Sequence, residues 1–234
     1  MKTLLIADLQ TTDLLYYEDD FRNECYEYCS RRDIDSLPDV ESAYHFYKRD
    51  DKAKSFKKSE IEPRRRIETD QPAFAPIVID KFREQPLLFV YTSDELSGVI
   101  HFSDYNNPQV SGYLYELLHH YEKSLRALLL MQHGSIESKI KKGQELEKMY
   151  LPPLIEEVCK KTKLQLDRNV RDLRNAVMHA KDPVKKSETS IENYAYDLTS
   201  FADFYSHVLS LQRDLRRVKN YISFLDQDIY KVSG

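Results

Sequence analysis

Apolar residues recur with a helical period through the second half of the chain. Leu114, Leu117, Tyr121 and Leu125 stand three or four residues apart, which places them on one face of a helix over residues 113–130. A glycine and then two consecutive prolines interrupt the pattern, and two further helical patterns follow, so we expect a helical bundle over residues 109–234. The apolar faces expected for these last two helices are Leu166, Val170, Leu173, Val177 and Ala180, then Ile191, Tyr194, Leu198, Phe201, Phe204, Val208 and Leu211.

The first half of the chain has shorter apolar runs, which predict a mixed α/β region over residues 1–108. The order helix, strand, turn, strand is expected to occur twice there. Together with the helical second half, this organisation predicts an α+β protein of two domains, 1–108 and 109–234. The expected elements are a helix at 19–32, extended pieces at 34–38 and 44–47, a basic linking stretch at 48–66, an amphipathic helix at 74–82, and a hairpin at 87–102.

Composition narrows the class of protein. Apolar residues make up 41% of the chain and charged residues 32%, as in a globular protein, and no apolar run is long enough to span a membrane. The first seven residues are too short an apolar run for a signal peptide, so we expect a cytoplasmic protein. Three cysteines cannot form a disulfide framework, and we expect neither a metal site nor a cofactor. Acidic residues exceed basic ones before residue 109, and basic residues slightly exceed acidic ones after it, which is compatible with a phosphate backbone meeting the second half.

The segment Arg174-Asn175-Ala176-Val177-Met178-His179 carries the candidate chemistry. A neutral imidazole can take a proton near pH 7, and a guanidinium can hold a phosphoryl group that gains negative charge. Asn175 and His179 lie one helical turn apart and share a face, whereas Arg174 is about 140° from His179 around the helix. Only the long arginine side chain would bring its guanidinium near the imidazole, and Arg171 would add a basic group for RNA binding.

This arginine and asparagine followed by a histidine, in a helical half-chain, resembles the motif of the HEPN superfamily. The resemblance implies a bundle of four to five antiparallel helices and an active site in the cleft of a homodimer. It also implies a metal-independent endoribonuclease, in which a ribose 2′-hydroxyl attacks the adjacent phosphodiester with Arg174 and His179 as catalytic groups and Asn175 orienting the histidine. Many such proteins act as toxins or in antiviral defence, so an antitoxin is a further expected partner beside the RNA substrate.

A second resemblance concerns residues 89–104. Phe89-Val90 and Gly98-Val99-Ile100-His101-Phe102-Ser103-Asp104 resemble the end of a CBS motif, and residues 13–56 resemble a divergent first copy by the order of their elements. A CBS pair implies a regulatory module that binds an adenine nucleotide, here through Asp104, Ser103 and His101. His101 stands where the motif has serine or threonine, and Ser103 could substitute for it. Asp104 could equally cap the helix that follows.

Other functions fit the same residues. His179 could be an interface histidine, Arg174 could pair with Asp167 or Asp172, and Asn175 could cap a loop. The chain would then be a non-catalytic helical module that binds RNA, a nucleotide or a protein. A third alternative makes the whole chain a nucleotide sensor that acts on a partner.

Overall fold

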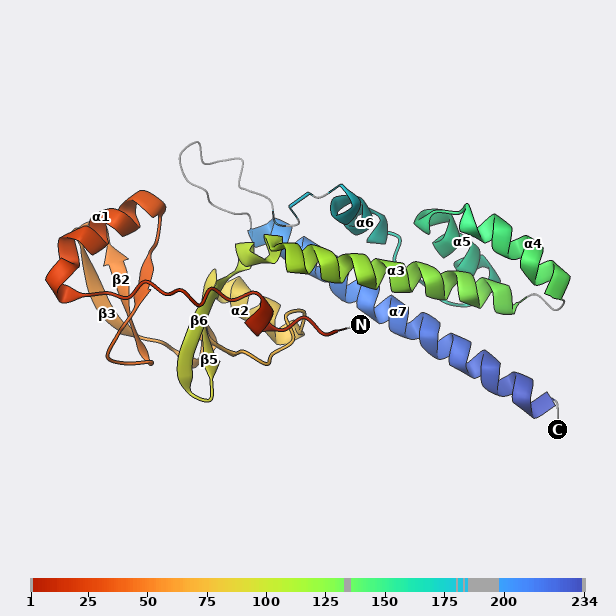
Figure 1. The fold of residues 1–234 in the computed structure, drawn as a ribbon, viewed down its shortest axis with the longest axis horizontal. Coiled ribbons are helices and arrows are strands. Elements are labelled where there is room, and N and C mark those ends of the chain that lie inside the picture. Colours follow the sequence, from red (N-terminus) through yellow and green to blue (C-terminus); the bar gives the residue numbers. More distant parts are fainter. Residues whose placement is uncertain (1, 133–135, 180, 183, 185–197, 233–234) are drawn as a thin grey trace. The chain divides into compact units, whose positions relative to one another are not determined.

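The computed structural model describes residues 2–132, 136–179, 181–182, 184 and 198–232 (Figure 1). It confirms an α+β fold, in which a mixed α/β region with two small sheets precedes a helical region. The chain divides into two compact units. The N-terminal unit is Thr3–Gln109 with Val184–Ala202, and the helical unit is Met1–Lys2, Val110–Pro183 and Asp203–Gly234. No described helix is long and apolar enough to cross a lipid bilayer.

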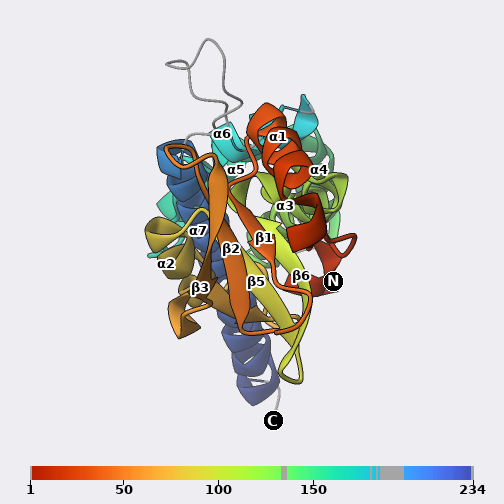
Figure 2. The ribbon, with the colours of Figure 1, turned by 90° about the vertical axis from the view of Figure 1, so that its left-hand side faces the viewer.

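The N-terminal unit contains two three-stranded sheets (Figure 2). In the first, the order β1-β2-β3 is antiparallel throughout. In the second, β4 pairs with β5 in parallel and β5 pairs with β6 as an antiparallel hairpin. The elements are α1 (Arg22–Arg32), β1 (Ser36–Pro38), β2 (His45–Asp50), β3 (Ser55–Glu60), β4 (Arg66–Glu68), α2 (Pro76–Glu84), β5 (Leu87–Thr92) and β6 (Glu95–His101).

Both helices and the hairpin that the sequence predicts in this region are confirmed. The hairpin turn consists of Ser93 and Asp94, which both have positive φ, as a tight two-residue turn between strands requires. Gly98 in β6 is needed for a different reason. A Cβ atom at this position would lie 2.8 Å from the carbonyl oxygen of Thr11, in the N-terminal segment that pairs with β6 at Val99.

The expected linker over residues 48–66 is wrong. This stretch contains the end of β2, all of β3 and the start of β4. Strand β3 is an edge strand with lysines at 57 and 58 exposed to solvent, and such charged edges are common because they prevent further strand pairing. The apolar content of β3 is therefore low, and its charged residues do not give the alternating pattern by which a strand is predicted from the sequence.

Two arginines of this expected linker, Arg65 and Arg66, lie against aromatic rings. The guanidinium carbon of Arg65 lies 4.4 Å from the ring centre of Phe46 and 5.1 Å from that of Phe89. Burial lowers the pKa of Arg65. Arg66 lies over Tyr44 in the same way, so these side chains join the two sheets through cation–π contacts.

A cluster of aromatic rings forms the core between α2 and the start of α7 (Leu198–Val232). The ring of Phe201 in α7 lies 5.4 Å from Phe82, 5.5 Å from Phe102 and 5.0 Å from Tyr105, centre to centre. All four side chains are buried. The Tyr105 hydroxyl donates a hydrogen bond to the Ala73 carbonyl. The first turn of α7 thus belongs to the core of the N-terminal unit.

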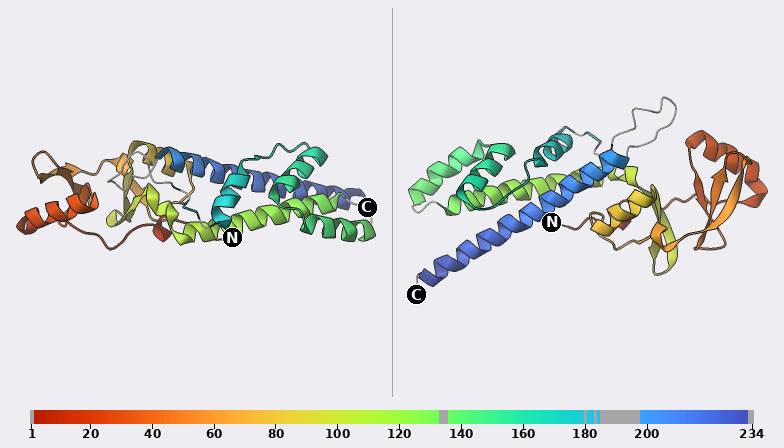
Figure 3. Two further views of the ribbon diagram at one scale, coloured as in Figure 1. Left: turned by 90° about the horizontal axis from the view of Figure 1, so that it is seen from above. Right: turned by 180° about the vertical axis from the view of Figure 1, so that it is seen from behind.

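The helical unit contains α3 (Pro108–Met131), α4 (Ile136–Glu147), α5 (Leu151–Lys161), α6 (Val170–Met178) and most of α7. Helix α3 begins at Pro108, earlier than the predicted residue 113, and its predicted apolar stripe is buried. Helix α7 runs beside α3 (Figure 3), and Gln212 of α7 donates a hydrogen bond to the Tyr113 hydroxyl of α3. The part of the predicted last helix before residue 198 lies outside the described residues.

The loop before α6 is held against α7. The carboxylate of Asp214, whose side chain is fully buried, accepts a hydrogen bond of 2.6 Å from the Asp167 backbone N–H. Arg217 of the same helix donates to the Gln165 carbonyl at 2.6 Å. These contacts hold the segment that leads into α6, and α6 carries the residues of the candidate site.

Candidate functional site

Helix α6 separates its apolar and polar residues cleanly. Val170 and Leu173 are buried on one face. Arg171, Arg174 and Asn175 follow the spacing i, i+3, i+4, so they share another face. Arg171 is exposed, and Arg174 and Asn175 are half-buried. The predicted apolar face is confirmed for its buried members, whereas Val177 is only half-buried and Ala180 lies outside the described residues.

His179 lies just beyond the last residue of α6, at the C-cap position. Its backbone N–H donates to the Asn175 carbonyl at 3.1 Å, so the histidine still follows Asn175 by one turn. Its backbone has left helical geometry, with φ −103° and ψ 13°. The side chain is exposed. An exposed imidazole at a helix end can meet a large substrate, which a histidine packed inside the bundle could not do.

Arg174 forms an ion pair with a residue of another helix. Its Nε atom lies 3.5 Å from a carboxylate oxygen of Glu122 on α3, and Arg126 lies 3.2 Å from the other oxygen. Arg126 also donates to the Leu146 and Met149 carbonyls at the end of α4. Glu122 of α3 is thus the ion-pair partner of Arg174, and the alternative pairing of Arg174 with Asp167 or Asp172 is not seen among the described residues. The Glu122–Arg126 spacing of i, i+4 was visible in the sequence, but its link to Arg174 was not.

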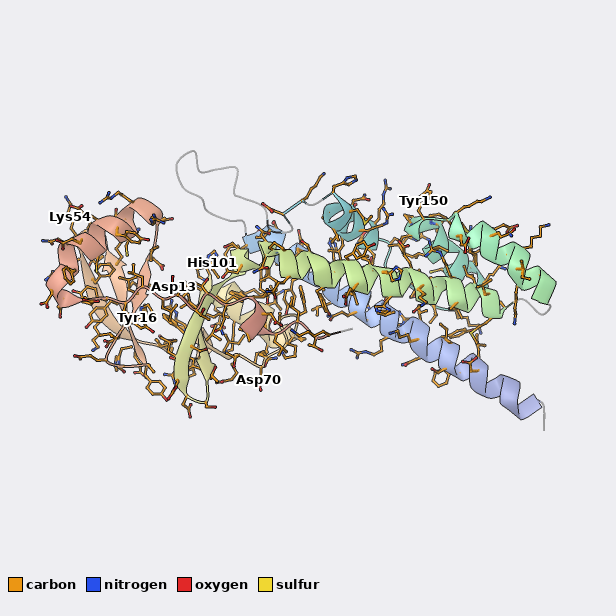
Figure 4. The ribbon with its side chains drawn as sticks, in the orientation of Figure 1. Asp13, Tyr16, Lys54, Asp70, His101 and Tyr150 are labelled. Atoms are coloured by element: carbon orange, nitrogen blue, oxygen red, sulfur yellow. The ribbon has the colours of Figure 1, made fainter. Side chains whose placement is uncertain are left out.

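An open cavity of about 460 Å³ lies between the start of α5 and the polar face of α6. Arg171, Arg174 and Asn175 line it from α6. The facing wall consists of Tyr150, Pro152, Pro153 and Glu156. Figure 4 labels Tyr150, which immediately precedes α5. His179 does not line this cavity, but it continues the row of Arg171 and Asn175 along the helix.

The wall from α5 was not predicted. The sequence pattern predicts only a break between helices at Pro152 and Pro153, whereas both prolines occupy the first turn of α5, where a missing N–H costs nothing. Leu151, Leu154, Ile155 and Val158 are buried in the unit. Glu156 is left on the face that opens toward α6, three residues after Pro153. The apolar pattern of α5 could have shown that Glu156 is exposed, but not what it faces.

The residues predicted to bind a nucleotide in the N-terminal unit lie together where β6 ends. Asp104 accepts a hydrogen bond from the His101 backbone N–H at 2.8 Å, and His101 Nδ1 lies 2.7 Å from the Ser103 hydroxyl. Ser103 N–H also donates to that ring nitrogen, so the three residues cap the short 3₁₀ helix Phe102–Asn106. Burial lowers the pKa of His101, which favours the neutral ring that accepts these bonds. The three groups thus bond with one another, as a cap requires.

Replacing Asp104 by asparagine should change how stability depends on pH. Burial raises the pKa of Asp104 to about 6, above the ordinary value of 3.8, despite the bond from His101. The folded state therefore binds the proton more tightly, and this contribution to stability is complete below pH 3.8 and lost as the pH rises to about 6. Between pH 4 and pH 7, the free energy of unfolding of Asp104→Asn should gain about 2–3 kcal/mol relative to the wild type. Urea unfolding at four pH values measures this.

Asp70→Asn is the matched control, because Asp70 is exposed (Figure 4). Its difference from the wild type should stay nearly constant over the same pH range. A constant difference for Asp104→Asn as well would show that Asp104 is solvated in the folded protein.

Among the described residues, no group of three or more histidine, cysteine, aspartate or glutamate side chains is arranged to hold a metal ion. Comparison with known proteins gives no match: no family model, no curated protein and no solved structure matches the chain.

Proposed function

We propose that the protein is an endoribonuclease of the HEPN type, which cleaves RNA through the residues of α6 without a metal cofactor. The observation that carries this proposal is the polar row on α6. Arg171, Arg174 and Asn175 open onto a cavity, and the exposed His179 continues the row at the helix end. A row of cations can hold an RNA backbone, and the histidine at its end can transfer protons.

The proposed reaction is an internal transesterification. His179 takes the proton of a ribose 2′-hydroxyl, whose oxygen attacks the adjacent phosphorus as the bond from phosphorus to the 5′-oxygen breaks. The imidazolium returns a proton to the leaving 5′-oxygen. The guanidinium of Arg174 stabilises the charge that develops on the phosphoryl oxygens. Asn175 orients His179, which follows it by one turn.

A homodimer would complete the site. One copy supplies a single histidine at a helix end, and a second copy related by a two-fold axis would add another Arg171, Arg174 and His179. The same proposal includes gating by the N-terminal unit. An adenine nucleotide bound near His101, Ser103 and Asp104 would alter the dimer or the cleft, as suits a toxin or a defence nuclease whose activity must be restrained by a ligand or an antitoxin.

One observation favours the alternative of a binding module without catalysis. Arg174 is already paired with Glu122, so its charge is partly compensated before any RNA binds. In a binding module this pair would only shape the surface. In a nuclease the pair would hold the guanidinium in place for the reaction. Only the nuclease forms cleavage products, so the products distinguish a nuclease from a binding module.

The test is incubation of the purified protein with single-stranded RNA in EDTA. We expect fragments with 2′,3′-cyclic phosphate and 5′-hydroxyl ends, because the 2′-oxygen is the nucleophile. A matched oligonucleotide with 2′-deoxyribose at each cleaved position should remain intact at those positions, and DNA should not be cut. Cleavage at the deoxy positions would contradict the mechanism. Intact RNA, with or without adenine nucleotides and at protein concentrations that favour a dimer, would favour the binding module.

A further inference from the structure

The cavity beside α6 contains more than the proposed cleavage reaction uses. An exposed tyrosine and a carboxylate line the wall opposite the arginines, and neither has a part in the chemistry of Arg174 and His179. We propose that this cavity binds one guanine nucleotide of the RNA and thereby selects where the chain is cut. This inference rests on the proposed function in taking RNA as the ligand, and it adds a base preference that the cleavage reaction does not require.

The α6 side of the cavity fits a phosphate. Arg171 is exposed, and the structure shows no ion pair for its guanidinium within the described ranges. Arg174 shares its charge with Glu122, which leaves its remaining N–H groups for a second acceptor. Asn175 adds an amide on the same face. Two guanidinium groups one turn apart are suited to a phosphodiester, because each presents N–H groups in a planar fork that matches its oxygens.

The α5 side offers a surface for a base. The side chain of Tyr150, which immediately precedes α5, is 65% exposed, and this leaves its ring available. Pro152 and Pro153 extend this apolar surface and are half-buried. Aromatic side chains stack on unpaired bases of any identity, so Tyr150 explains affinity but not selectivity.

Glu156 supplies the selectivity. It is exposed, lines the cavity, and forms no ion pair with another residue of the described part of the chain. An ionised carboxylate has two acceptor oxygens and no donor. Guanine presents two adjacent donors, N1–H and the N2 amino group, on its Watson–Crick edge, so it can satisfy both oxygens at once. Adenine and cytosine each offer an amino group beside a ring acceptor that would face the carboxylate, and uracil offers one N–H between two carbonyl groups.

The volume agrees with a single nucleotide. A cavity of about 460 Å³ falls in the lower part of the range for small-ligand sites. The two walls separate the roles, because the cations come from α6 and the carboxylate from α5. A second phosphate beside Glu156 would be repelled, which favours a neutral, donor-rich group there.

The experiment measures binding without cleavage. The probes are 2′-O-methyl RNA nonamers of uridine in which the central position is guanosine, adenosine, cytidine or uridine, and fluorescence anisotropy gives the dissociation constant of the full-length protein for each. We expect the guanosine probe to bind about tenfold more tightly than the other three. Equal affinities, preference for another base, or no binding to any probe would overturn the proposal.

Two variants assign the preference to its residues. Glu156→Gln should remove the tenfold advantage of guanosine, and the ratio of affinities is the readout because loss of a negative charge strengthens binding to every RNA. Tyr150→Ala should lower the affinity for all four probes by about tenfold, whereas Tyr150→Phe should bind them as tightly as the wild type does. Glu116→Gln and Tyr115→Ala are matched controls on the exposed face of α3, and both should behave as the wild type. A guanosine advantage that survives in Glu156→Gln would overturn the role of Glu156.

Failure of this inference can be told from failure of the proposed function. A guanosine preference that depends on Glu156, in a protein that leaves RNA intact, supports the subsite and contradicts the nuclease. Cleavage with cyclic phosphate ends at every base alike supports the nuclease and overturns the subsite.

Discussion

Alanine in place of His179 is expected to lower the rate of RNA cleavage by about 10²–10⁴-fold, the range over which a positioned acid or base accelerates proton transfer. The imidazole is exposed at the end of α6, so its removal leaves no cavity in the helical core. The loss should therefore appear in the catalytic rate, while RNA affinity and the free energy of unfolding change little. Single-turnover cleavage measures the rate, and anisotropy with an uncleavable RNA measures the affinity.

His119→Ala is the matched control, because His119 is an exposed histidine on α3 that does not line the cavity. It should cleave RNA at the wild-type rate. Retention of more than half the activity by His179→Ala would exclude this histidine from the reaction. A loss of affinity without loss of rate would instead assign it to RNA binding.

Alanine in place of Phe201 should lower the free energy of unfolding by about 3–5 kcal/mol, as is typical for deletion of a buried aromatic ring. This ring is fully buried and contacts Phe82, Phe102 and Tyr105. Because it comes from the first turn of α7, which belongs to the N-terminal unit, its loss removes ring contacts within the core of that unit. Urea unfolding followed by tyrosine fluorescence measures the change.

Phe224→Ala provides the comparison on the same helix. Its side chain is 64% exposed, so the free energy of unfolding should change by no more than about 0.5 kcal/mol. The loss of unfolding free energy in Phe201→Leu should lie between the losses in Phe201→Ala and Phe224→Ala, because leucine fills part of the space of the ring. If Phe201→Ala changed the free energy of unfolding as little as Phe224→Ala, the aromatic cluster would contribute little to stability.

Local pattern was a good guide to the helices. The stripe on α3, the inward residues of α6 and the hairpin of β5 and β6 follow directly from periodicity, because burial of one face imposes that period on the sequence. The pattern failed at β3, where an edge strand needs few apolar residues. It failed also at Arg65, because nothing in a run of three arginines shows which one will lie on aromatic rings.

In the candidate site, too, some features follow from the local sequence pattern and others from tertiary packing. The sequence by itself determined the helical row that ends in His179, since a helix of known period places Asn175 and His179 one turn apart wherever the helix lies. Only the tertiary structure decided that Glu122 pairs with Arg174, and that Tyr150 and Glu156 face the arginines across a cavity. These partners lie tens of residues away or on another helix. Their approach depends on how whole helices pack, which is set by many buried contacts at once and by no single spacing along the chain.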